Sequence, residues 1–116
     1  MPEEFDEQEL LDRIDGDLEF LEETVSMLEE DCPPLLEDVR QAAASNDAEA
    51  LAKSAHALKG LFANFCAGPA TDTARALEML GRDNRLTDIQ PAVRVLEDEA
   101  ARLRAALQAF LQARKP

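Results

Sequence analysis

Apolar residues recur every three or four positions along most of the chain, which is the spacing of one face of an α-helix. The longest such stripe follows intervals of four and three: Ile89, Val93, Leu96, Ala100, Leu103, Leu107 and Phe110. This spacing is typical of a long helix in a bundle. The sequence has no alternation of apolar and polar residues long enough for a β-strand, so the pattern predicts an all-α protein.

Helix-breaking residues divide the pattern into shorter segments. Helices are predicted over residues 7–14, 17–31, 33–44, 47–65, 69–80 and a last segment that carries the stripe above. Pro33 and Pro34 are expected to end the second helix and to begin the third, because proline is tolerated only in the first turn. Gly81 is expected to end the fifth helix in a left-handed conformation.

Two capping boxes are predicted from the sequence. Asn46 with Glu49 is expected to cap the helix over residues 47–65, and Thr87 with Gln90 the last helix. Amphipathic helices with short connections favour an antiparallel up-down four-helix bundle, with an additional short N-terminal helix as a lid. A length of 116 residues indicates a single domain over residues 1–116, with a core of about residues 7–112.

The single histidine, His56, is predicted to face away from the core. At about 100° per residue, one side of its helix collects the apolar residues Leu51, Ala55, Leu58, Phe62 and Phe65. His56 lies roughly 140° from that line. Lys59 and Gly60 follow at i+3 and i+4, the spacings that make side chains neighbours on a helix. The histidine side therefore carries one cation and one residue without a side chain.

This arrangement suits a nucleophile that carries a phosphoryl group. A neutral imidazole nitrogen can attack an acyl phosphate, and Lys59 could meet the added negative charge. Gly60 inside a helix costs about 1 kcal/mol relative to alanine, which indicates that another protein approaches closely there. The same face carries small or cationic residues that form the expected partner-binding face: Ala52, Lys53 and Ala63.

These residues resemble the histidine-containing phosphotransfer (HPt) domain family of multistep phosphorelays, whose motif is roughly His-x-Leu-Lys-Gly followed by small residues. Here the motif is His56-Ala57-Leu58-Lys59-Gly60, and the resemblance covers about residues 7–112. It implies that His56 is phosphorylated, that Lys59 stabilises the phosphate and that Gly60 is kept bare for a receiver domain. The chain departs from the family at Leu61, often serine, and at Cys66, often glycine.

The resemblance extends to two positions on the next helix. In some members a polar side chain bonds the ring nitrogen that is not phosphorylated, and an arginine one turn later lies near the phosphate. Glu78 and Arg82 occupy these positions. A Glu78 carboxylate would accept the Nδ1 proton and leave Nε2 of His56 as the nucleophile. The alternative is that both residues are solvated near a helix end.

Composition excludes several partners. The net charge of −13, from 12 basic and 25 acidic residues, would repel nucleic acid and anionic membranes. No apolar run approaches the ~18 residues needed to span a bilayer, and the start of the chain is acidic where a signal peptide is basic. A cytoplasmic protein is expected. Cys32 and Cys66 then indicate reduced, buried thiols rather than a disulfide.

The predicted function is that of a phosphoryl carrier, not an independent enzyme. The expected partners are response-regulator receiver domains and a histidine kinase, with no cofactor of its own, Mg²⁺ on the receiver and a monomeric state. The alternative is an HPt-like interaction module that does not relay phosphate, which a carboxylate at Glu78 would favour by repelling a phosphoryl group. An enzyme would need a second histidine or a phosphate-binding loop, and a metal site more ligands than His56 with Glu49.

Overall fold

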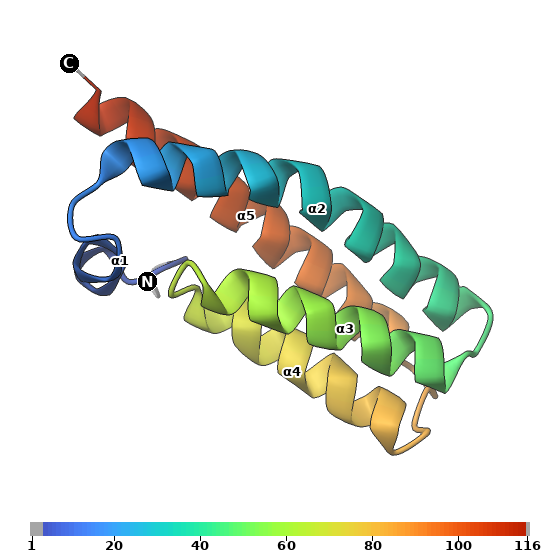
Figure 1. Cartoon of the computed structure of the whole chain (residues 1–116). Coiled ribbons are helices and arrows are strands. Elements are labelled where there is room, and N and C mark those ends of the chain that lie inside the picture. The colour runs from blue at the N-terminus through green and yellow to red at the C-terminus, as the bar shows by residue number, and fades with distance from the viewer. Residues whose placement is uncertain (1–3, 116) are drawn as a thin grey trace.

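Five α-helices make up the computed structural model, which describes residues 4–115 (Figure 1). In chain order they are α1 (Glu7–Arg13), α2 (Leu18–Ala44), α3 (Ala48–Ala63), α4 (Gly68–Arg82) and α5 (Gln90–Arg114). No strand occurs within residues 4–115, and the all-α prediction is confirmed. Residues 1–3 lie outside the described residues. They belong to the acidic start of the chain, which differs from the basic start of a signal peptide.

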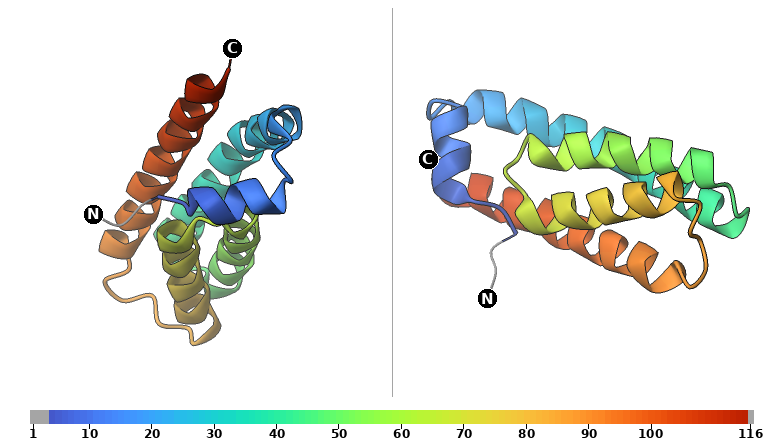
Figure 2. Two further views of the ribbon diagram at one scale, coloured as in Figure 1. Left: turned by 90° about the vertical axis from the view of Figure 1, so that its left-hand side faces the viewer. Right: turned by 90° about the horizontal axis from the view of Figure 1, so that it is seen from below.

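Helices α2 to α5 form an antiparallel bundle in which each helix packs on the next and α5 closes the ring against α2 (Figure 1). The short α1 lies across one end of the bundle (Figure 2). Two hydrogen bonds attach it to the end of α3 and the loop that follows: Arg13 Nη1 donates to the Ala63 carbonyl at 2.8 Å, and the Asp6 amide donates to the Cys66 carbonyl at 3.0 Å. The predicted four-helix bundle with an extra N-terminal helix is confirmed.

The predicted apolar stripes form the core. Every position of the stripe on α5 is at most 5% exposed, and the five apolar positions predicted for the histidine helix are at most 3% exposed. Burial of one large apolar side chain stabilises the fold by about 1.5–3 kcal/mol. These contacts fix the rotation of α3 about its own axis, so its opposite side faces outward.

The predicted helix end at Pro33 and Pro34 is wrong, because α2 continues through both prolines. The buried positions of α2 keep helical spacing on either side of them: Leu21, Val25, Leu28, Cys32, Val39 and Ala42. Both prolines are exposed, so the carbonyl groups that lose their amide partners lie on the side of the helix where water can bond to them. The unbroken apolar stripe therefore outweighs the missing hydrogen bonds.

Four helix ends share one backbone geometry, which differs from the caps predicted from the sequence. Four helices are followed by a residue with positive φ, and the amide after that residue donates to the carbonyl four residues before it. The four positive-φ residues are Asp15, Asn46, Cys66 and Asn84. Asn46 therefore ends α2, and Asp47 caps α3 by accepting the Ala50 amide at 3.0 Å. The predicted box is wrong, because the cap lies one residue later and Ala50 has no side chain that could return the bond. The positive φ of Cys66, 57°, is a conformation that favours glycine.

The predicted cap of the last helix is also wrong. Ile89 precedes α5 in a helical conformation and makes no side-chain capping bond. The Ile89 side chain is 4% exposed and belongs to the core, so burial rather than a polar cap fixes the start of this helix.

Gly81 does not end α4 but lies buried inside it, against α3. A Cβ atom at Gly81 would lie 2.8 Å from the Ala52 nitrogen and 2.9 Å from the Ala48 carbonyl oxygen. Only glycine permits this approach of two helix backbones. The left-handed residue that ends α4 is Asn84 instead, with a φ of 55°.

We expect Gly81→Ala to lower the free energy of unfolding by about 1–3 kcal/mol, because the new methyl group would force α3 and α4 apart. Gly60→Ala makes the same chemical change on the outer side of α3, where nothing lies within 4 Å of the added atom. It should stabilise the protein by about 0.5–1 kcal/mol. Urea denaturation followed by circular dichroism tests both, and a Gly81→Ala variant as stable as the wild type would contradict the close-packing account.

Candidate functional site

His56 lies on the outer side of α3, and its side chain is 62% exposed. Its neighbours Ala55 and Leu58 are fully buried and fix the orientation of the helix at this point. The imidazole therefore stands on an accessible surface rather than in a cleft, as the sequence pattern predicts.

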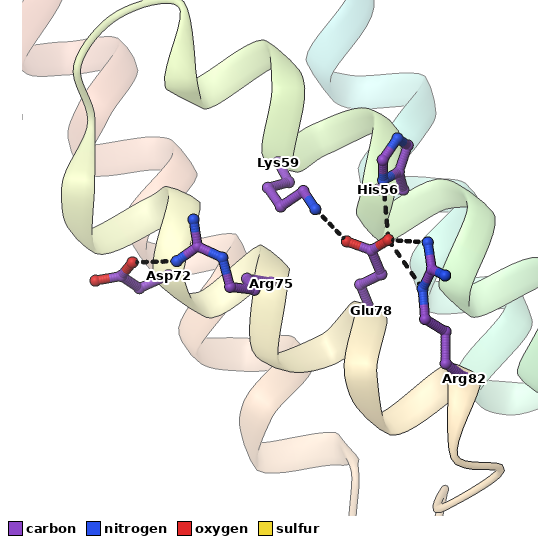
Figure 3. A network of polar contacts seen from close by, with 6 residues as sticks. All are labelled: His56, Lys59, Asp72, Arg75, Glu78 and Arg82. Carbon is purple, nitrogen blue, oxygen red and sulfur yellow. Dashed lines mark hydrogen bonds and ion pairs between the residues drawn. The ribbon is translucent and has the colours of Figure 1, made fainter.

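One carboxylate on α4 connects the charged residues around His56 (Figure 3). Glu78 Oε2 lies 2.9 Å from His56 Nδ1 and 2.5 Å from Arg82 Nη2, with Arg82 Nε at 3.1 Å. The other oxygen, Oε1, lies 2.7 Å from Lys59 Nζ. The structure thus brings together four of the predicted site residues from two helices.

Glu78 is buried, with only 4% of its side chain exposed. The Lys59 ammonium is the largest influence on its ionisation, and hydrogen bonds from Arg82 and His56 act in the same direction against the desolvation of the carboxylate. Together they lower the pKa of Glu78 to about 2. Glu78 is therefore ionised at neutral pH, and the expectation of a solvated side chain at this position is wrong.

The ionised carboxylate determines which ring nitrogen of His56 carries hydrogen. A carboxylate can only accept a hydrogen bond, so Nδ1 must be the donor in its contact with Glu78. In the neutral ring the lone pair then lies on Nε2, which points away from the carboxylate (Figure 3). The geometry leaves Nε2, with its lone pair, on the side of the ring that faces away from Glu78.

The cations differ in their exposure. Lys59 is 28% exposed and Arg82 is 63% exposed, so both are partly accessible to solvent. Each already pairs with Glu78, and together they carry one more unit of charge than that carboxylate neutralises. The site therefore holds a net positive charge beside an imidazole, in a protein that is strongly acidic overall.

Gly60 is exposed and open, whereas the three residues of the expected partner face have different surroundings. Lys53 and Ala63 are exposed. Ala52 is half-buried, because its backbone lies opposite Gly81 on α4. Of the three, Ala52 thus lies on the contact between α3 and α4 rather than on the open surface.

Helix α2 contributes residues to this surface that sequence reasoning missed. A shallow depression beside His56 and Gly60 is lined on the α2 side by Asp31, Pro34 and Leu35. These three positions follow the i, i+3, i+4 spacing of one helix face. This shared face could not be predicted, because the sequence pattern places a helix end at residue 31.

Within residues 4–115, no group of three or more histidine, cysteine or acidic side chains is placed to hold a metal ion. In the same part of the chain, none of the helices combines the length and apolar character needed to cross a membrane. Both cysteines, Cys32 and Cys66, are free thiols.

Comparisons with known proteins identify the family of this chain. The Hpt domain family matches residues 23–106, and the chain belongs to this family. Its family membership makes it a histidine phosphotransfer protein of phosphorelay signalling. Members of the family are phosphotransfer carriers that work with kinases and receiver domains.

The fold is also that of a solved structure. The crystal structure of histidine-containing phosphotransfer protein B (HptB) from Pseudomonas aeruginosa PAO1 superposes with a TM-score of 0.78 at 23% sequence identity, over 99% of this chain and 100% of that chain. No curated protein sequence matches the chain significantly.

Glu78→Gln should destabilise the protein at neutral pH by about 1–3 kcal/mol, because Lys59 and Arg82 lose a charged partner. The pKa of Glu78 falls from an ordinary 4.5 to about 2 on folding, so its stabilising contribution is complete above pH 4.5 and disappears as the pH falls toward 2. The stability difference between variant and wild type should shrink over that range.

Unfolding free energies measured at a series of pH values test this expectation. Asp72→Asn is the matched control on the same helix, because Asp72 is 74% exposed and pairs with the exposed Arg75, so little change is expected at any pH. A Glu78→Gln difference that stays constant down to about pH 3 would contradict the ionic role of Glu78.

Proposed function

We propose that His56 is the residue that carries the phosphoryl group, and that it exchanges this group with the phosphoaspartate of a receiver domain. The observation that carries the proposal is the bond between His56 Nδ1 and the buried Glu78, at 2.9 Å, which leaves Nε2 as an exposed nucleophile. In the transfer, the Nε2 lone pair attacks phosphorus, the bond from phosphorus to the aspartate oxygen breaks, and the receiver carboxylate is regenerated.

Lys59 is proposed to stabilise the transferred group. Its ammonium lies one helical turn from His56 and is partly exposed, so it can form a charge-assisted hydrogen bond to a phosphoryl oxygen. Arg82 adds positive potential from α4. Gly60 leaves open space next to the imidazole, which supports close approach of a receiver domain.

The receiver domain is proposed to supply Mg²⁺ and most of the electrostatic stabilisation, while this protein supplies an aligned nucleophile and a cation. On this account the protein is a carrier without turnover of its own, needs no cofactor and acts as a monomer in the cytoplasm. A histidine kinase can be the donor, with a response regulator as the acceptor.

The interaction module without phosphate relay is less well supported. It was favoured by the negative charge of Glu78, but that charge is paired with both Lys59 and Arg82, so an incoming phosphoryl group does not meet an isolated carboxylate. The pairing supports the carrier over the module.

His56→Gln should abolish phosphorylation and leave the fold intact, because the His56 side chain is 62% exposed. The measurement is acid-labile, alkali-stable phosphate on wild type and variant after incubation with a panel of phosphorylated receiver domains. Label retained on the variant would mean that another residue accepts the group. Binding of a receiver without label on the wild type would favour the interaction module.

Lys59→Ala should slow transfer about ten- to hundredfold, the equivalent of one charge-assisted hydrogen bond, without preventing it. Arg75→Ala is the control, since Arg75 is an exposed cation on α4 that pairs with Asp72. Single-turnover transfer rates from a phosphorylated receiver provide the comparison. Transfer by Lys59→Ala at the wild-type rate would exclude the proposed assistance by Lys59.

A further inference from the structure

We propose, on the basis that His56 is the carrier, that Asp31 on α2 determines which receiver domains can exchange phosphate with this protein. A receiver that fits presents a lysine or arginine side chain near its phosphoaspartate, and this cation pairs with the Asp31 carboxylate when the two proteins dock. A receiver without such a cation leaves the carboxylate unpaired in the interface and binds more weakly.

The depression beside His56 extends to α2, and Asp31 is the only carboxylate among the described residues that line it. Apart from His56, the other lining residues are uncharged: Pro34, Leu35, Ala57, Gly60, Leu61 and Asn64. The Asp31 side chain is exposed. A protein–protein interface covers about 800 Å² on each partner, far more than one imidazole. A receiver that places its phosphoaspartate on His56 therefore covers Asp31 as well.

Apolar side chains surround Asp31 along the same face of α2. Met27 and Pro34 lie one turn away on either side, at i−4 and i+3, and Met27 is 58% exposed. Asp31 and Met27 also line a second groove, which continues toward α1 past the half-exposed Phe20. A docked partner covers this apolar surface and removes water from the carboxylate. Because an unpaired buried charge is costly, the apolar surroundings increase the discrimination between receivers with and without a cation.

Asp31 makes no ion pair within residues 4–115. Several other acidic residues of α2 pair with cations of the same chain: Glu22 with Lys115, Glu29 with Arg104 and Glu37 with Arg40. The two cations beside the imidazole, Lys59 and Arg82, both pair with Glu78. The Asp31 carboxylate is thus available to a cation from a partner, and the net charge of −13 attracts such a cation.

The backbone offers a second acceptor next to Asp31. In a helix, the Glu30 carbonyl bonds the amide at position 34 or, in a tighter turn, the amide at position 33. Both positions are prolines, which have no amide hydrogen, so neither bond can form. The ring of a proline lies against the carbonyl four residues before it, and Pro34 lines the depression. Lysine and arginine carry several donor hydrogens, so one such side chain can bond this carbonyl and the Asp31 carboxylate together.

The test measures phosphoryl transfer from a panel of phosphorylated receiver domains to wild type, Asp31→Asn, Asp31→Lys and the control Glu22→Gln. Glu22 lies about 180° around α2 from Asp31, in an exposed pair with Lys115. For receivers that transfer to the wild type, kcat/KM should fall about tenfold in Asp31→Asn and about hundredfold in Asp31→Lys, because a charge-assisted hydrogen bond is lost and then replaced by repulsion. The loss should lie in the KM for the receiver, and the control should stay within about twofold of the wild type.

Direct phosphorylation by phosphoramidate is the second readout, because this small donor needs no docking surface. Asp31→Lys should be labelled at least as fast as the wild type. Equal KM values for wild type and Asp31→Lys with every transferring receiver would overturn the proposal. Slower labelling of Asp31→Lys by phosphoramidate would also overturn it, because the substitution would then act on His56 or on the fold. A wild type that takes up no label from phosphoramidate or from any receiver would instead overturn the role of His56, which distinguishes the two failures.

A complementary substitution on the receiver identifies the partner cation. Each exposed lysine or arginine around the phosphoaspartate of a transferring receiver is changed to glutamate in turn. One of these receiver variants should transfer poorly to the wild type and regain about tenfold or more in kcat/KM with Asp31→Lys, because the exchanged charges attract again. If no receiver variant shows this recovery, the proposed pairing of Asp31 with a receiver cation is wrong.

Discussion

The close contact between α3 and α4 at Gly81 positions the side chains of His56 and Glu78 next to each other. Gly81 lies so close to α3 that a Cβ atom there would be 2.8 Å from the Ala52 nitrogen. The two helices are antiparallel, so the residue one turn before Gly81 lies beside the residue one turn after Ala52. Those residues are Glu78 and His56, and their side chains meet at 2.9 Å. A packing constraint between two backbones therefore determines which nitrogen of the imidazole faces outward.

Burial of a carboxylate at this contact has two unfavourable effects. Burying an unpaired charge is costly, and a negative charge near a phosphoryl group repels it. Lys59 and Arg82 reduce both penalties by pairing with Glu78 and leave a net positive charge at the surface. The four residues form one network, in which the carboxylate orients the ring and both cations remain partly exposed.

The sequence predicted the helices and the outward position of His56 because both follow from apolar periodicity, which reports burial directly. It failed where one residue type serves two roles. The sequence pattern predicts Gly81 as a helix C-cap, but Gly81 lies inside α4, where its lack of a side chain permits close packing on α3. The pattern predicts Asn46 as an N-cap, but its positive φ ends α2 instead. Pro33 was taken to end a helix that burial on both sides continues. Because a helix end was expected at Pro33, the surface that α2 forms beside His56 could not be predicted. The positions of Glu78 and Arg82 were predicted from the family resemblance.

The central claim is that His56 accepts the phosphoryl group on Nε2 while Nδ1 remains bonded to Glu78. Its most direct test is NMR of the phosphorylated wild type, with phosphorus–nitrogen couplings to identify the modified atom. The account predicts a single phosphohistidine with phosphorus on Nε2 and hydrogen on Nδ1. Phosphorus on Nδ1, or on a residue other than His56, would contradict it.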